Sequence, residues 1–300
     1  MGVNPGFLLG WIVLLQFIFT LVFSIQCYPL QPGGLIAFQS LLLGLTDPYH
    51  VLHEIESNLE VILLLVFMVS AIFFMKNLLM VIFTKLLQRV KSKILLSLLF
   101  VISAAFLSAF LDALTVTAVL ITVMVGFYHV FESSFKSNEI TKDEFEQVKS
   151  FLTDIMMHGA VGTALGGVCT IVGEPQNLLI ADKAGWEFME FFYKMAPVTM
   201  PVLVAGLICC LLIEKFKVFS YGHEMTDEMR NKIIANAEKV DAERTDMEKL
   251  HLVFEAILGL CLIFALGLHL APVGIIGLFL MVIFNSFQRY YRRTPTRWCF

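Results

Sequence analysis

Two acidic side chains interrupt long apolar stretches of this chain. Asp112 lies in the segment 108–117 (SAFLDALTVT), and Glu174 lies in the segment 166–177 (GGVCTIVGEPQN). A charged side chain at the centre of a membrane costs about 2.5 to 3.5 kcal/mol on insertion scales, so its presence there calls for a function. Such residues usually mark the path of an ion or a proton, and this is the chemistry that the two carboxylates predict.

Hydroxyl groups accompany the first carboxylate. Ser108, Asp112 and Thr115 are spaced i, i+4 and i+7, which in a helix or hairpin places two hydroxyls and a carboxylate on one face. Hard cations such as Na+ prefer oxygen ligands of this kind. The alternative is an aspartate that helix packing alone stabilises.

The second carboxylate lies where a helix should break. Pro175 has no N–H donor and disfavours a helical conformation at the residue before it, which is Glu174. Thr170 and Asn177 add a hydroxyl and an amide nearby. The alternative is a loop at the membrane surface. The residues that predict the helix break are Gly166, Gly167, Gly173 and Pro175.

Other kinds of site find little support in the sequence. The glycines at 159–167 have no GK[ST] partner, so a phosphate-binding loop is excluded, and close helix packing is the better interpretation. The six cysteines and seven histidines lack metal-ligand spacing, so we expect neither a metal centre of these residues nor a cofactor. His158 could relay protons, although an interfacial histidine is the simpler interpretation.

The composition indicates a membrane protein. Hydrophobic residues make up 58% of the 300 residues and charged residues only 15%, which is too apolar for a soluble domain. The charges, with a formal net value of -4, gather in a few connecting segments. We therefore predict an all-α, polytopic membrane protein and exclude nucleic-acid binding.

Apolar runs of the length that one helix needs to cross the hydrocarbon predict the membrane spans. Full spans are expected at 7–25, 59–74, 195–213 and 250–270, a partial crossing at 28–45, and a segment that is short for a crossing at 274–284.

The distribution of charge sets the expected topology. Lys85, Arg89, Lys91 and Lys93 mark the cytoplasmic side, residues 47–58 should face outward, and an amphipathic helix at 76–89 should follow the inner interface.

The central region suggests two irregular elements. Residues 94–130 form either one tilted span or a hairpin, and the mixed-charge stretch 132–154 that follows, with a capping box at Thr141 and Glu144, favours the hairpin. Residues 155–180 predict a broken helix, and 184–193 an interfacial segment. The end of the chain, 284–300, is interpreted either as a basic cytoplasmic tail or as a frameshifted end.

Five regions follow from these assignments. They are N-terminal transmembrane and interfacial helices at 1–93, a transport core at 94–213, a charged cytoplasmic loop at 214–250, further transmembrane helices at 251–288 and an aberrant basic tail at 289–300.

Two long motifs carry a resemblance to a known family. FLSAFLDALTV at 106–116 and GTALGGVCTIVGEPQNLLIA at 162–181 resemble the NhaB family of bacterial Na+/H+ antiporters. The resemblance implies a fold of two inverted repeats, each with a re-entrant hairpin and a broken helix, of which this chain carries one half. It also implies that Asp112 near the hairpin tip and Glu174 in the helix break meet near the bilayer midplane.

The resemblance implies exchange of cytoplasmic Na+ for external H+ in a bacterial inner membrane, with no enzymatic activity. Asp112 and Glu174 would bind either cation, and a homo-oligomer is compatible with the sequence. The neutral ligands would be Ser108, Thr115, Thr170 and Asn177.

Three alternatives remain open at this point. An anion or dicarboxylate carrier of the same fold would bind its substrate at helix N-termini and would not need two acids. An intramembrane hydrolase would need a paired nucleophile and base, which the sequence does not clearly offer. A truncated, transport-inactive fragment is the third, because the family's usual N-terminal segment and second repeat are missing from this sequence.

Overall fold

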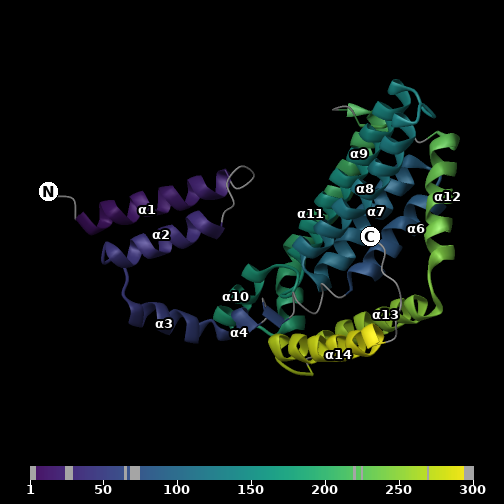
Figure 1. The fold of residues 1–300 in the computed structure, drawn as a ribbon. Helices are drawn as coiled ribbons and strands as arrows, with labels where there is room; N and C mark the ends of the chain where they lie inside the picture. The colour runs from purple at the N-terminus through teal and green to yellow at the C-terminus, as the bar shows by residue number, and fades with distance from the viewer. Residues whose placement is uncertain are drawn as a thin grey trace. The chain divides into compact units, whose positions relative to one another are not determined.

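A computed structural model describes most of the chain as helices (Figure 1). It describes residues 5–23, 30–63, 66–67, 75–218, 221–223, 226–268 and 270–293. Within these ranges there is no strand, so the predicted all-α class is confirmed. The chain divides into two compact units, Met1–Leu59 and Glu60–Phe300, which are described separately.

Among its described residues, the first unit contains three helices. The apolar helices α1 (Pro5–Val22) and α2 (Leu30–Leu42) pack against each other, and the polar helix α3 (Pro48–Ser57) follows. Asp47 caps α3, because its side chain accepts hydrogen bonds of 2.9 Å from the N–H groups of Tyr49 and His50. The span predicted at 7–25 corresponds to α1. Most of the span predicted at 59–74 lies outside the described residues, apart from the short helix α4 (Leu59–Leu63).

The second unit holds the region with both carboxylates. Its helices are α6 (Lys76–Arg89), α7 (Lys93–Leu111), α8 (Ala113–Lys136), α9 (Lys142–Gly167), α10 (Pro175–Ala184), α11 (Phe188–Phe216), α12 (Asp227–Glu243), α13 (Asp246–Gly267) and α14 (Val273–Arg293). Among the described residues, four helices are long and apolar enough to cross a membrane, namely α7, α8, α11 and α13. A polytopic membrane protein is the class that this pattern supports.

Helices α7 and α8 form a hairpin whose two arms pack on α9 (Figure 1). α7 runs parallel to α9, because Lys93 contacts Asp154 near one end while Thr170, just beyond α9, reaches Ala109 near the other. α8 runs antiparallel to α9, since Thr117 bonds Thr163 and Phe135 stacks on Phe145. The hairpin alternative for 94–130 is therefore confirmed. Each arm is long enough to cross the hydrocarbon, so helix length alone does not require re-entry.

Glycines bring α7 and α9 into close contact. A Cβ atom added to Gly162 would meet the backbone of Val101, and one added to Gly166 would overlap the backbone of Ala105. Small residues at such positions allow two helix backbones to approach in a membrane, where packing rather than the hydrophobic effect drives association. Helix packing, which the sequence favoured over a phosphate-binding loop, is what these glycines do.

A buried glutamate joins α6 to α13. Met75, at the start of α6, makes no side-chain cap bond. Instead Glu255 of α13, which is fully buried, accepts a 2.8 Å hydrogen bond from the N–H of Leu78 and a second from the Asn77 amide. The first N–H groups of a helix lack partners within it, so this carboxylate stabilises the beginning of α6. The apolar face of α6, formed by Leu79, Phe83 and Leu87, is buried on the same unit.

Some helix ends lie where the sequence predicted them, and others do not. The capping box of Thr141 and Glu144 is confirmed at the start of α9. α11 begins at Phe188 rather than Met195, so that Pro197 and Pro201 lie inside the helix. α14 continues to Arg293, well beyond the segment predicted at 274–284.

Replacing Gly166 by alanine should disrupt the hairpin's packing on α9. The new methyl group would overlap the Ala105 backbone, which cannot move away as a flexible side chain could. We expect a loss of about 1 to 3 kcal/mol in the free energy of unfolding. The measurement is unfolding of the purified protein in detergent, followed by circular dichroism.

Gly126→Ala is the matched control on α8. Nothing lies within 4 Å of the position that its Cβ would take, so this variant should be at least as stable as the parent chain. Equal stabilities for the two variants would contradict the proposed role of Gly166 in packing.

Candidate functional site

Asp112 forms the turn of the α7–α8 hairpin. Its φ of 73° is unusual for a residue other than glycine, and aspartate is among the few side chains that tolerate this conformation. The side chain is 5% exposed, and its Oδ2 accepts hydrogen bonds of 3.1 Å from both the N–H and the hydroxyl of Thr115. Asp112 is thus the N-cap of α8.

The hairpin turn corrects one detail of the sequence interpretation. Because the helix ends at Leu111, Ser108 and Thr115 lie on different helices and do not share an uninterrupted helical face with Asp112. Thr115 contacts the carboxylate directly. Ser108 instead donates a 2.7 Å hydrogen bond to the carbonyl oxygen of Thr163, so it joins α7 to α9.

Glu174 ends a non-helical segment between α9 and α10. α9 ends at Gly167 and α10 begins at Pro175, which leaves 168–174 as the break. Glu174 is the extended N-cap residue of α10, but its side chain makes no cap bond. Its Oε2 accepts a 3.3 Å hydrogen bond from the side-chain amide of Gln176. Gly173 is required here, because a Cβ would overlap the backbone of Gly167.

Hydrogen bonds join the hairpin turn to the helix break. The N–H of Ala113, next to Asp112, donates to the carbonyl oxygen of Gly173, next to Glu174, at 3.2 Å. The Thr170 hydroxyl donates to the carbonyl oxygen of Ala109 and accepts from the N–H of Gly173 at 3.2 Å. Both carboxylates therefore belong to one junction at the same end of α7, α8 and α9.

Asn177 completes the junction from α10. Its buried side-chain amide donates to the carbonyl oxygens of Gly167, at 3.0 Å, and of Thr170, at 2.8 Å. These are groups that the broken helix would otherwise leave without partners. Thr170 and Asn177 thus hold the non-helical backbone in place, and their predicted role as direct cation ligands stays a prediction.

The junction combines oxygen atoms with the ends of four helices. α8 and α10 present their positive N-terminal ends to the two carboxylates, while α7 and α9 end there with their carbonyl groups. Carboxylate, hydroxyl and carbonyl oxygens are the donor set that suits a hard cation. Within the described part of the chain, no group of three or more His, Cys, Asp or Glu side chains could hold a metal ion.

Comparison with known proteins identifies the family. The family model described as bacterial Na+/H+ antiporter B (NhaB) matches residues 3–291 of this chain. The chain belongs to the NhaB family.

Curated relatives named Na(+)/H(+) antiporter NhaB match nearly all of the chain. The protein of Shewanella halifaxensis is 50% identical over 95% of this chain, that of Teredinibacter turnerae 50% over 96%, and that of a Marinomonas species 52% over 94%. The chain spans between 56% and 60% of the length of these three relatives. Their name describes transporters of ions rather than enzymes, and the resemblance seen in the two motifs is confirmed.

The NhaB-family chain also contains a buried charged cluster that the sequence did not reveal. It consists of Lys93 of α7, Asp154 and His158 of α9, and Glu214 of α11. Lys93 Nζ lies 3.2 Å from Asp154 Oδ2 and 3.5 Å from Glu214 Oε1, and His158 Nε2 lies 2.9 Å from Glu214 Oε1.

This cluster corrects several assignments. His158 is 2% exposed and bonded to Glu214, so it has a charged partner that the sequence did not show. Glu214, predicted to begin a cytoplasmic loop, is a buried part of α11, and Lys93 and Asp154 are buried rather than solvated. The i, i+4 spacing of Asp154 and His158 is the one signal that could have suggested a shared face.

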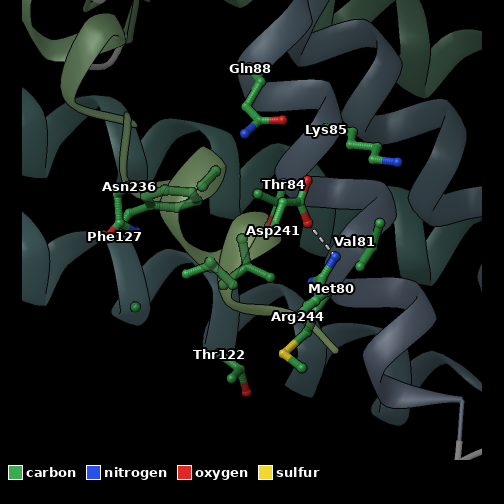
Figure 2. Close-up of a pocket in the computed structure, with 14 residues that line it drawn as sticks. Met80, Val81, Thr84, Lys85, Gln88, Thr122, Phe127, Asn236, Asp241 and Arg244 are labelled. Carbon is green, nitrogen blue, oxygen red and sulfur yellow. Dashed lines mark hydrogen bonds and ion pairs between the residues drawn. The ribbon is translucent and has the colours of Figure 1, made fainter. Parts of the chain in front are cut away.

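A cavity lies elsewhere in the same unit (Figure 2). It has a volume of about 350 Å³ and is bounded by α6, α8 and α12, with the ion pair of Asp241 and Arg244 at its wall. Lys85 and Gln88 of α6 and Thr122 of α8 add polar groups to an otherwise largely apolar lining. None of its lining residues belongs to the junction of Asp112 and Glu174 or to the charged cluster.

Replacing Thr170 by valine should weaken the junction. The change leaves the N–H of Gly173 and the carbonyl of Ala109 without the hydroxyl that joins them. Loss of a partner for buried polar groups costs about 1 to 3 kcal/mol, so the unfolding midpoint of the detergent-solubilised protein should fall.

Thr122→Val serves as the control for this substitution. The hydroxyl of Thr122 is exposed and bonds only the carbonyl of Ala118 in its own helix, so a change within about 0.5 kcal/mol is expected. An equal effect of both substitutions would argue against the bridging role of Thr170.

Proposed function

We propose that this chain forms the cation-exchanging part of a multi-pass sodium/proton antiporter of the bacterial inner membrane. Cytoplasmic Na+ and external H+ are its substrates, and Asp112 and Glu174 are the groups that bind them. The single observation that carries the proposal is the hydrogen bond from Ala113 to Gly173, which ties the residues next to the two carboxylates to each other.

Competition for the carboxylates couples the two fluxes. A carboxylate can hold a proton or lie against a sodium ion, but one oxygen does not do both, so release of one ion permits binding of the other. The buried position of Asp112 strengthens this exclusion, because a charged side chain away from water needs a compensating cation. In this proposal the transport core corresponds to residues 94–213.

The four neutral side chains contribute to the proposed cation site in two ways. Thr115 is the proposed neutral ligand closest to the charge, since its hydroxyl already contacts Asp112. Ser108, Thr170 and Asn177 hold helix-end carbonyl groups in position by donating to them, while their own oxygen atoms keep lone pairs for a cation.

The helix ends favour a cation over an anion. An anion carrier of this fold would present free helix N-termini to its substrate. Here the N-terminus of α8 is already covered by the Asp112 carboxylate, and that of α10 follows directly on Glu174. An anionic substrate at this junction would meet two negative charges, which supports the sodium/proton assignment over a dicarboxylate carrier.

Asp112→Asn should abolish sodium-dependent proton movement while preserving the fold. Asparagine caps helices as well as aspartate does, so α8 keeps its N-cap and only the charge is lost. The measurement is the dequenching of a pH-sensitive dye when Na+ is added to acidified everted vesicles that carry the protein. Glu174→Gln should have the same effect.

Asp182→Asn, at an exposed site on α10, is the matched control and should retain the activity. Full sodium-dependent dequenching in both carboxylate variants, at equal amounts in the membrane, would refute the proposal.

Proton competition should appear in the apparent affinity for sodium. If one carboxylate site serves both ions, the Na+ concentration that gives half-maximal flux should rise by up to about tenfold for each unit that the pH falls below the site's own titration. The same vesicle assay measures it across a series of pH values. A half-maximal concentration that is independent of pH would exclude competition.

Growth tests whether the 300 residues suffice for transport. We expect the chain to restore growth of a bacterium that lacks its own sodium/proton antiporters on high-sodium medium, and the Asp112→Asn variant to fail. Growth equal to the empty-vector strain, despite insertion of the protein in the membrane, would instead support the transport-inactive alternative.

A further inference from the structure

The buried charged cluster lies at the opposite end of the α7–α9 pair from Asp112 and Glu174. Lys93 and Asp112 are separated by the whole length of α7, which corresponds to about 28 Å along the helix. The cluster therefore cannot ligate the same ion as the junction, and the antiport proposed above does not use it. Burying four ionisable side chains together is costly, so the cluster calls for its own explanation.

The charges of the cluster do not balance. Lys93 supplies one positive charge against the two negative charges of Asp154 and Glu214, which leaves a net charge of -1 when His158 is neutral. Glu214 Oε1 contacts Lys93 Nζ and His158 Nε2, and it accepts a 2.9 Å hydrogen bond from the hydroxyl of Ser97. Its Oε2 is buried and has no hydrogen-bond partner among the described residues. An additional proton would neutralise the cluster.

The contact with Glu214 fixes which nitrogen of a neutral His158 ring is free to take a proton. A carboxylate accepts hydrogen bonds, so the 2.9 Å contact assigns the Nε2 proton of His158 to Glu214 Oε1. Nδ1 is then the basic nitrogen of the neutral ring. Protonation there gives an imidazolium directly against the Glu214 carboxylate, and the net charge of the cluster becomes zero.

Two further titratable groups, on the segment after α11, lie against the cluster. His223 is 34% exposed, and its Nδ1 lies 3.3 Å from Asp154 Oδ2, the oxygen that Lys93 also contacts. The Tyr221 ring lies 5.0 Å from the His158 ring. Burial raises the pKa of the Tyr221 phenol and the charge of Asp154 raises it further, so this group stays neutral.

We propose that His158 and Glu214, supported by Lys93 and Asp154, form a second proton-binding site that takes up and releases one proton. The proton comes from water and is held on the imidazole of His158, and on release it returns to water. No bond other than N–H is made or broken. The titratable groups that face the site are Lys93 on α7, Asp154 and His158 on α9, Cys210 and Glu214 on α11, and Tyr221 and His223 on the segment that follows.

Nuclear magnetic resonance of the histidine side chains tests the site without requiring transport. The full chain is labelled with ¹³C-histidine and titrated in detergent micelles, and the resonance that His158→Gln removes is assigned to His158. We expect this resonance to report the uptake of one proton as the pH is lowered. A His158 resonance that keeps one chemical shift over the whole pH range in which the protein stays folded would overturn the proposal.

Two charge-removing variants locate the negative partner. Glu214→Gln should move the His158 titration to lower pH, because the imidazolium loses its neighbouring carboxylate. Glu132→Gln is the matched control, since it removes the partner of the exposed His129, 3.2 Å away, and should leave His158 unchanged. If Glu214→Gln leaves the midpoint where it was, with the other histidine resonances in place, the proposed pair is wrong.

A final pair of titrations separates this site from the junction. Addition of Na+ should not move the His158 midpoint in the Asp112→Asn variant, whose proposed cation site is disabled. Movement of the midpoint by Na+ in that variant would show that the cluster binds sodium and would overturn its assignment to the proton. Because the resonance is read on the purified protein, failure of antiport in vesicles leaves this test intact.

Discussion

The constraint on which the structure depends is that polar backbone groups in an apolar environment must find partners within the protein. A helix that breaks at membrane depth exposes N–H and carbonyl groups, each of which costs several kcal/mol if it is left without a partner. The segment 168–174 meets this requirement through its neighbours. Ala113 and Asn177 donate to the carbonyls of Gly173 and Thr170, and the Thr170 hydroxyl donates in turn to the carbonyl of Ala109 in the hairpin.

That requirement also explains why the hairpin and the broken helix occur together. The polar backbone groups of the break find hydrogen-bond partners in the hairpin turn, and those of the turn find partners in the break. Neither element would therefore be stable at this place alone. The close approach of α7 and α9 at Gly162 and Gly166 is what brings the two within hydrogen-bond distance. Charge at Asp112 and Glu174 is thus tolerated because the surrounding backbone is already held in position.

Features that depend on interactions between neighbouring residues were predicted from the sequence, whereas features that depend on contacts between distant residues were not. Local signals were sufficient where one stretch of chain decides the outcome, as at the Thr141 capping box, the helix at 76–89 and the break before Pro175. Contacts between distant residues left no such signal. Lys93 meets Glu214 across more than a hundred residues, and Glu255 caps a helix that begins at Lys76.

The difference between local and long-range interactions also explains which predictions about charged residues were wrong. The sequence placed Lys93 at the cytoplasmic side, Asp154 in a mixed-charge stretch and Glu214 at the start of a charged cytoplasmic loop. Lys, Asp and Glu in such segments are usually exposed. Lys93, Asp154 and Glu214 are buried instead, since each lies where three helices converge and each finds a charge of opposite sign. A lone ionisable residue in such a position would be excluded by its desolvation cost, whereas a set that can gain or lose a proton can adjust its net charge to the apolar surroundings.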